Sequence, residues 1–208
     1  MKAFIYTGGD VLYSAVSHSP AKEDLCIVAD QGYRHAKQLG IRPHLFVGDF
    51  DSLSQNELPK DIEVLEVPAE KDVTDTQLAV EEALTRGAEE IVIISGIGSR
   101  LDHTLSNLAL LEDLYDRHVH AMMTNGYNRV RFIRSTSTLI GRSQYPYLSL
   151  ITNDPIAKGV SIEGCKYPLK NAKIRRGWQF AVSNEISGNC TLISVRKGGL
   201  YLIESLDA

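Results

Sequence analysis

The sequence predicts an α/β protein in which an N-terminal three-layer domain with a mostly parallel sheet is followed by a small all-β, sandwich-like domain. Three observations lead to this prediction. Strand-like apolar runs alternate with helical patterns up to residue 124. Most of those runs are apolar throughout, as expected for parallel strands that are covered on both faces. Beyond residue 127 the helical patterns stop, and short runs with a period of two residues replace them.

In the N-terminal half, strands and helices are expected to alternate. The expected strands are residues 3–7, 25–29, 45–47, 62–67, 91–95 and 119–124. The expected helices are residues 32–39, 74–85 and 102–117. The last helix contains leucines at spacings of three and four residues, which predicts an apolar face made of Leu101, Leu105, Leu108, Leu111 and Leu114.

The C-terminal half is expected to contain only strands and turns. The strand-like runs are RVRFIR (129–134), YLSLIT (147–152), GVSIEG (159–164), WQFAVSN (178–184), NCTLISVR (189–196) and GLYLIES (199–205). Gly, Asn, Asp and Pro separate them, as in a small antiparallel sandwich or barrel. We place the boundary near Asn125 and Gly126, which gives domains of residues 1–125 and 126–208.

Composition argues against several classes of partner. The formal net charge is −4 and the pI is about 5.9, so the chain has no general attraction to nucleic acid or to an anionic membrane. No segment approaches the roughly 18 apolar residues that span a bilayer. Three widely separated cysteines fit neither a disulfide framework nor a zinc site, and we expect small buried thiols in a reducing cytoplasm.

Carboxylates follow several of the expected strands. In parallel α/β sheets ligands bind at the carboxyl ends of the strands, and there these acids would repel one another unless a cation joined them. Mg²⁺ fits better than Ca²⁺, because it shares itself between one or two carboxylates and the phosphates of a substrate. The residues concerned are Asp30, Asp49, Asp51, Asp72, Asp75 and Asp102.

Each of these carboxylates also has a structural interpretation. Asp49 and Asp51 suit a strand-to-helix turn. Thr74 and Gln77 fit a capping box, in which Asp75 at the first helical position simply suits the helix dipole. For any single residue the structural and functional interpretations both stay open, whereas acids at successive strand ends favour a site.

The loop GIGSR (96–100) is a candidate phosphate-binding loop. Gly98 permits close approach to the backbone, and the Arg100 guanidinium can bind phosphate oxygens with two hydrogen bonds. The loop is neither a Walker A sequence nor a dinucleotide fingerprint, so an NAD enzyme is not expected. A phosphatase of the Asp-x-Asp-x-Thr type is excluded because Leu53 takes the threonine position.

Several motifs together resemble one family. GDFDS (48–52), KDVTDTQLA (71–79) and the sequence from Gly96 to Asn107, followed by GCKYPL (164–169) and the pair Ser183-Asn184, are similar to the thiamine pyrophosphokinase family over nearly the whole chain. Two positions depart from the family pattern: Gln77 stands where many bacterial relatives have an acid, and Tyr167 where some have Trp.

The resemblance implies transfer of the pyrophosphoryl group of ATP to the hydroxyl of thiamine, giving thiamine diphosphate and AMP. It implies a homodimer with thiamine bound where the domains of two subunits meet, an ATP- and Mg²⁺-binding domain at 1–125, and a thiamine-binding, dimerising domain at 126–208. The implied residues are Asp49, Asp51 and Asp75 for Mg²⁺ and catalysis, Asp30, Asp72, Gly98, Arg100 and Asp102 for ATP, and Tyr167, Ser183 and Asn184 for thiamine.

Alternatives remain at this point. The chain could be a Mg²⁺-dependent kinase or nucleotidyl-type transferase for another small alcohol, or a non-catalytic nucleotide-binding module. Tyr167 and Trp178 have core packing as an alternative to a role in the site. The histidines show no metal-ligand spacing and are expected to be surface or satisfied residues, among them His35 and His44, with His103 closest to the site.

Overall fold

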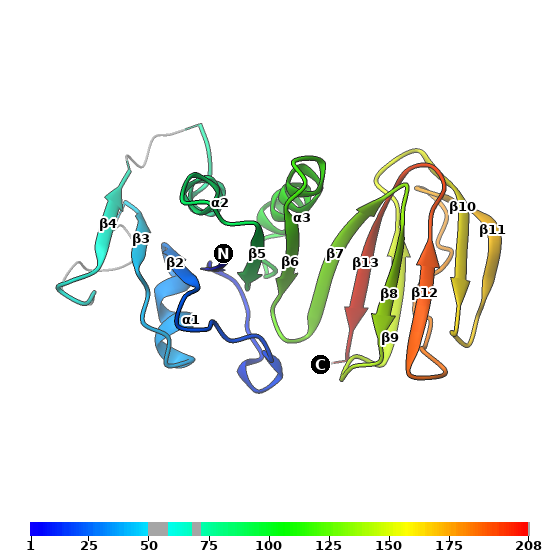
Figure 1. Cartoon of the computed structure of the whole chain (residues 1–208), viewed down its shortest axis with the longest axis horizontal. Helices are drawn as coiled ribbons and strands as arrows, with labels where there is room; N and C mark the ends of the chain where they lie inside the picture. Colours follow the sequence, from blue (N-terminus) through cyan, green and yellow to red (C-terminus); the bar gives the residue numbers. More distant parts are fainter. Residues whose placement is uncertain (50–57, 68–71, 208) are drawn as a thin grey trace. The chain divides into compact units, whose positions relative to one another are not determined.

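The computed structural model describes residues 1–49, 58–67 and 72–207. The chain divides into two compact units, Met1–Gly126 (unit 1) and Tyr127–Ala208 (unit 2), shown in Figure 1. Within the described ranges, none of the helices has the length and apolar character needed to cross a membrane.

Unit 1 is built on a parallel sheet. Its strands, in the spatial order β4-β3-β2-β1-β5-β6, are β4 (Glu63–Glu66), β3 (Leu45–Gly48), β2 (Leu25–Ala29), β1 (Lys2–Tyr6), β5 (Glu90–Ile94) and β6 (His120–Thr124). Every neighbouring pair is parallel. The inner strands are almost entirely buried, whereas β4 at the edge is largely exposed, with Val64 at 42%.

In the described part of unit 1, three helices cover this sheet on two faces. They are α1 (Gly32–Gln38), α2 (Asp75–Thr85) and α3 (Leu101–Asp116), and a short 3₁₀ helix, η1 (Tyr13–Ala15), lies in the loop after β1. The crossover through α1 moves along the sheet in one direction, and those through α2 and α3 move in the other. Because such crossovers are right-handed, α1 lies on one face and α2 and α3 on the other. Figure 1 shows α2 and α3 next to each other and apart from α1.

The structure confirms the predicted fold class and the elements of the first half. Each expected strand and helix of unit 1 is present, with ends that differ by at most one residue. The predicted apolar face of α3 is wrong in its first turns. Leu111 and Leu114 are buried, but Leu101 is 66% and Leu105 57% exposed, because the inward face of the first turns carries Thr104 and Asn107, which line a cavity.

Unit 2 consists of antiparallel strands in two layers. One layer has the order β7-β13-β9 and the other β11-β10-β12-β8. The strands are β7 (Asn128–Arg134), β8 (Ser137–Gly141), β9 (Tyr147–Ile151), β10 (Ile156–Glu163), β11 (Leu169–Arg175), β12 (Cys190–Ser194) and β13 (Gly199–Ser205). Alternate apolar side chains such as Val160, Ile162 and Ile193 are fully buried, as in a sandwich.

The run WQFAVSN (178–184) was predicted as a strand, and this prediction is wrong. Ala181 and Ser183 have φ angles of +64° and +56°, which a regular strand does not contain. The segment is irregular and follows the edge of β9, where Asn184 and Leu148 exchange two backbone hydrogen bonds of 2.8 and 2.9 Å. Trp178 is 70% exposed, so the core-packing interpretation of this residue is also wrong, as it is for Tyr167 at 59%.

Two other expectations for unit 2 need correction. Strands β8 and β11 were not predicted, because their sequences are rich in polar residues and only one side chain in each is buried. The expectation of buried thiols holds for Cys26 and Cys165, whereas Cys190 is exposed on the outer face of β12.

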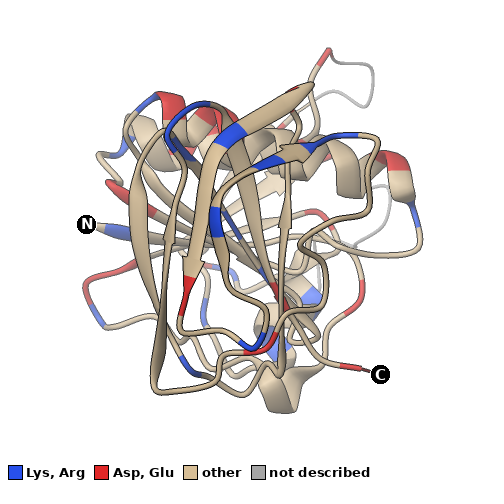
Figure 2. Ribbon diagram, turned by 90° about the vertical axis from the view of Figure 1, so that its right-hand side faces the viewer, with Lys and Arg blue, Asp and Glu red and all other residues tan. Residues whose placement is uncertain are grey.

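Charge is distributed unequally between the units. Unit 1 has 10 lysines and arginines against 21 aspartates and glutamates, a formal charge of −11. Unit 2 has 12 against 5, a formal charge of +7. Figure 2 marks these residues on the ribbon. The modest net charge of the chain therefore hides an acidic and a basic half.

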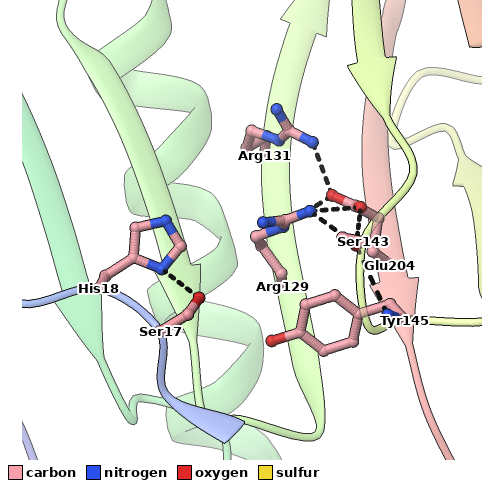
Figure 3. A network of polar contacts seen from close by, with 7 residues as sticks. All are labelled: Ser17, His18, Arg129, Arg131, Ser143, Tyr145 and Glu204. Carbon is pink, nitrogen blue, oxygen red and sulfur yellow. Dashed lines mark hydrogen bonds and ion pairs between the residues drawn. The ribbon is translucent and has the colours of Figure 1, made fainter. Parts of the chain in front are cut away.

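A buried ionic network joins β7 and β13 in unit 2 (Figure 3). Glu204 is 2% exposed and accepts hydrogen bonds from Arg129 (Nε, 2.8 Å) and Arg131 (Nη2, 2.6 Å). Arg129 donates a second bond through Nη2 at 2.5 Å, and the Ser143 hydroxyl donates a fourth, at 3.1 Å. Burial acts to raise the pKa of Glu204, but the hydrogen bonds and charges of the two arginines outweigh it and lower that pKa below its ordinary value. Glu204 is therefore an ionised residue in the interior.

Candidate active site

A cavity of about 490 Å³ opens in unit 1 at the carboxyl ends of β1, β2 and β5. Its walls come from four segments that follow strands or begin helices: residues 7–10, 29–31, 74–76 and 96–107. The chain leaves β1 toward β2 and leaves β5 toward β6, so the neighbours β1 and β5 form the point where the strand order reverses. Open α/β sheets bind ligands at this point.

Two glycine-containing loops pair with each other across the floor of the cavity. The backbone amide of Gly96 and the hydroxyl of Ser95 both donate to the carbonyl of Gly8, at 3.3 and 3.0 Å. In the other direction, the amide of Asp10 donates to the carbonyl of Ile97 at 3.2 Å. A side chain on Gly9 (φ +127°) would place its Cβ 2.6 Å from Ser95 Oγ, so this close pairing requires glycine.

The N-terminus of α2 presents Asp75 to the cavity. Thr74 is the N-cap, and its side chain accepts a 3.2 Å hydrogen bond from the amide of Gln77, as the capping box predicts. The hydroxyls of Thr76 and Thr7 are 2.7 Å apart and buried, which ties the first turn of α2 to the end of β1. Asp75 therefore lines the cavity from a fixed position, and its structural and functional interpretations are compatible.

Arg100 lines the cavity where α3 begins. Its guanidinium forms a surface ion pair of 2.7 Å with Asp102, which does not line the cavity. The hydrogen bond from Arg100 lowers the pKa of the Asp102 carboxyl to about 2. Asp102 therefore orients the arginine, and the arginine faces the cavity.

The structure brings some of the predicted carboxylates together. Asp30, which follows β2 with φ +48°, lines the cavity together with Asp75. Asp49 is half-buried at the end of β3 and Asp72 is exposed, and neither lines the cavity. Asp51 lies outside the described residues. The sequence analysis missed Asp10, although its place after a glycine pair at the end of the first strand is the same signal that identified the others.

The donor atoms in the cavity suit a hard cation. Asp30 and Asp75 offer carboxylate oxygens, and threonine hydroxyls lie beside them. In the described portion of the chain, no three His, Cys, Asp or Glu side chains are grouped so as to hold a metal ion. Mg²⁺ needs only one or two carboxylates when phosphates complete its shell, so the residues fit a Mg²⁺ ion that arrives with a polyphosphate.

In unit 2, the three residues predicted to bind a second substrate lie close together. The buried side chain of Asn184 accepts from the amide of Tyr167 at 3.0 Å and donates to its carbonyl at 2.8 Å. The amide of Ser183 donates to Ser149 Oγ at 3.0 Å. Asn184 thus holds the backbone of Tyr167, whose exposed ring lies 5.6 Å from the Lys166 ammonium.

A parallel α/β sheet with a polar, glycine-lined cavity at its reversal point defines a class of nucleotide-binding proteins. Comparison with known families is more specific. Residues 16–123 match the family described as thiamin pyrophosphokinase, catalytic domain, and residues 136–200 match its vitamin B1 binding domain. The chain belongs to the thiamin pyrophosphokinase family.

Individual relatives agree with this assignment. A thiamine pyrophosphokinase of Bacillus subtilis (strain 168) is 31% identical over 188 residues, which cover 88% of each chain. The crystal structure of thiamine pyrophosphokinase from Bacillus subtilis has a TM-score of 0.90 at 26% identity and covers 100% of both chains. The crystal structure of the thiamin pyrophosphokinase from Geobacillus thermodenitrificans has a TM-score of 0.87 at 29% identity. The match covers 100% of this chain and 99% of the Geobacillus chain.

Proposed function

We propose that the cavity of unit 1 binds ATP with Mg²⁺ and that Tyr167, Ser183 and Asn184 of unit 2 bind thiamine. The chain is an enzyme that transfers the pyrophosphoryl group of ATP to thiamine, which gives thiamine diphosphate and AMP. The main observation behind the site assignment is that two family motifs, residues 71–79 and 96–107, line one cavity at the reversal point of the sheet.

In the proposed reaction the thiamine hydroxyl attacks the β-phosphorus of ATP and the bond to the α-phosphate oxygen breaks, releasing AMP. Asp75 accepts the hydroxyl proton, since it is a carboxylate fixed at the cavity wall. Arg100, oriented by Asp102, binds the phosphate oxygens. Gly98, which has no side chain, lets the polyphosphate approach the backbone. These residues position the reactants, which is most of what such a transfer requires.

Asp75, which lines the cavity, is a proposed ligand of Mg²⁺, and the family resemblance adds Asp49, outside the cavity lining, and Asp51. Asp30, on the cavity wall, and Asp72, outside it, are proposed to contact ATP. Bound together with ATP, the ion would neutralise phosphate charge and polarise the β-phosphoryl group. In an acidic unit this neutralisation matters, because the carboxylates would otherwise repel the nucleotide.

Unit 2 is proposed to recognise thiamine by stacking on Tyr167 and by a hydrogen bond to the Ser183 hydroxyl, while Asn184 acts by holding Tyr167. The exposed apolar side chains of this unit support a homodimer, since surfaces of this kind usually mark an interface. They include Tyr167, Trp178, Phe180, Val182, Leu139 and Leu192. A cytoplasmic location is proposed from the free cysteines.

The function is tested by measuring AMP release from ATP and Mg²⁺ with and without thiamine, together with the product mass. AMP that depends on thiamine, and a product heavier by a diphosphate, are the expected results. Release of ADP would indicate a kinase that transfers one phosphoryl group to an alcohol. ATP binding with no turnover would indicate a nucleotide-binding module instead.

A further inference from the structure

We propose that His35 and Asn107 are positioning residues for pyrophosphoryl transfer, each holding a glycine carbonyl of the two paired loops on the cavity floor. His35 holds Gly9 in the loop after β1, and Asn107 holds Gly96 in the loop after β5. This inference rests on the proposed function, because it assumes that the polyphosphate of ATP lies over these loops.

His35 approaches from α1. Its Nε2 lies 3.1 Å from the carbonyl oxygen of Gly9, and because a carbonyl can only accept, Nε2 carries the hydrogen. The neutral ring then accepts at Nδ1 from the hydroxyl of Tyr13, 2.8 Å away, whose ring also packs against the imidazole at 5.8 Å. Burial lowers the pKa of His35, which favours this neutral form. Tyr13 thus fixes the orientation in which His35 donates to Gly9.

Asn107 approaches from α3 on the opposite face of the sheet. Its side chain is 5% exposed, and Nδ2 donates to the carbonyl of Gly96 at 2.9 Å. Gly96 has φ +73°, and a Cβ there would lie 2.7 Å from Met123 Sδ. One turn earlier on the same helix face, Thr104 Oγ1 accepts from the amide of Gly98 at 3.2 Å. The second loop is therefore bonded to α3 at two points.

The two paired loops are bonded to each other, and helices on both faces of the sheet hold them. The bonds between Gly8, Asp10 and residues 95–97 join them, so a displacement at either loop is passed to the other. Ser95, fully buried at φ +77°, adopts a conformation that L-residues avoid and that persists only when its surroundings impose it. Ser95 itself bonds to the carbonyls of Thr124 and Gly8, and Asn107 bonds the adjacent Gly96.

The chemical consequence concerns carbonyl oxygens. A carbonyl that faced the cavity would repel phosphate oxygens, because both carry negative partial charge. The Gly9 and Gly96 carbonyls are instead bonded to side-chain donors, so they are not presented to the nucleotide. Losing a donor frees the carbonyl and relaxes the loop, and a misplacement of about 1 Å costs on the order of 10²-fold in rate.

The test compares His35→Leu and Asn107→Asp with two further variants. His35→Gln keeps an N–H donor that can reach Gly9, so it should recover most of the activity. His44→Leu is the matched control: His44 belongs to the same unit and accepts from the amide of Cys26 at 3.0 Å, away from the cavity. All four are compared with the wild type for kcat, for KM of ATP and of thiamine, and for Tm.

We expect His35→Leu and Asn107→Asp to lower kcat by roughly 10- to 10²-fold with little change in KM for thiamine. Their Tm should fall no more than that of the control. Amide hydrogen exchange at Asp10 and Gly96 should become faster in both, which reports loop order without any need for turnover. Kinetics equal to the control in an active protein, or a Gln variant as slow as the Leu variant, would overturn this inference alone. Wild type without thiamine-dependent AMP would overturn the proposed function, and this inference with it.

Discussion

At the scale of single residues, one substitution can separate the structural role of Asp75 from the chemical role proposed for it. As a first-turn acid it interacts with the helix dipole, which contributes about 0.3–1 kcal/mol. In its proposed role as proton acceptor and metal ligand it would contribute far more to the rate. Asp75→Asn should therefore lower kcat by roughly 10²–10⁴-fold and leave thermal unfolding nearly unchanged. AMP release and calorimetry measure the two effects.

The control for Asp75 is Asp61→Asn, which removes a surface ion pair with Arg42. Exposed pairs contribute about 0–1 kcal/mol, so this variant should be active and almost as stable as the wild type. Parallel losses of activity and stability in Asp75→Asn would mean that the residue only begins the helix.

Residues whose roles depend on local pattern were predictable, and residues whose roles depend on contacts between a helix and a loop were not. Thr74 as a cap and Arg100 beside the cavity follow from a few neighbouring letters. His35 and Asn107 act on glycines 26 and 11 positions away in the sequence. No periodicity marks such contacts, which form only once each helix packs against the sheet beside its loop.

At the scale of secondary-structure elements, the pairing of β7 with β13 depends on Glu204. Replacing it by Gln removes the charge that compensates Arg129 and Arg131, of which Arg129 is largely buried. Breaking a buried pair in this way costs about 3–5 kcal/mol. We expect Glu204→Gln to lower the free energy of unfolding by this order at neutral pH, measured by chemical denaturation. Glu163→Gln, on the exposed side of β10, should change it little.

The same network has a defined pH dependence. Because the pKa of Glu204 is lower in the folded chain than its ordinary value of 4.5, its contribution is complete above pH 4.5 and is lost as the pH falls through the lower folded value. The difference in stability between wild type and Glu204→Gln should therefore shrink on acidification. A difference that stayed constant from pH 7 to pH 3 would mean that size, and not charge, matters at this position.

The sequence predicted some secondary-structure elements better than others, and the reason is physical. The buried parallel strands of unit 1 consist of continuous apolar runs, so β2 and β3 were found almost residue for residue. In unit 2, β11 has mostly polar side chains, while residues 178–184 have the apolar letters of a strand and the φ angles of a loop. Apolar letters predict a strand only where the side chains are buried in a sheet, whereas the large apolar side chains of residues 178–184 are exposed, with Trp178 at 70%.

At the scale of the whole molecule, exposed apolar groups predict self-association. Trp178 is exposed in the single chain, so Trp178→Ala should change the stability of unit 2 by no more than about 0.5 kcal/mol. If a second copy covers it, the variant should dissociate at higher protein concentration than the wild type, as measured by light scattering. Val64→Ala, an exposed apolar change on the edge of unit 1, is the control. A monomeric wild type would contradict the proposed homodimer.

The charge asymmetry predicts how the two substrates approach the enzyme. Unit 1, with a formal charge of −11, repels free ATP and attracts the positive thiazolium of thiamine. Chelating Mg²⁺ should therefore abolish turnover and weaken ATP binding, and excess Mg²⁺ should restore both.

Raising ionic strength from about 0.01 M to about 0.15 M shortens the screening length from roughly 30 to 8 Å and should raise KM for thiamine. Steady-state kinetics with chelator and with salt measure the two effects separately. Full turnover in chelator would exclude the proposed metal role. A KM for thiamine independent of salt would mean that contacts in unit 2, and not the field of unit 1, capture this substrate.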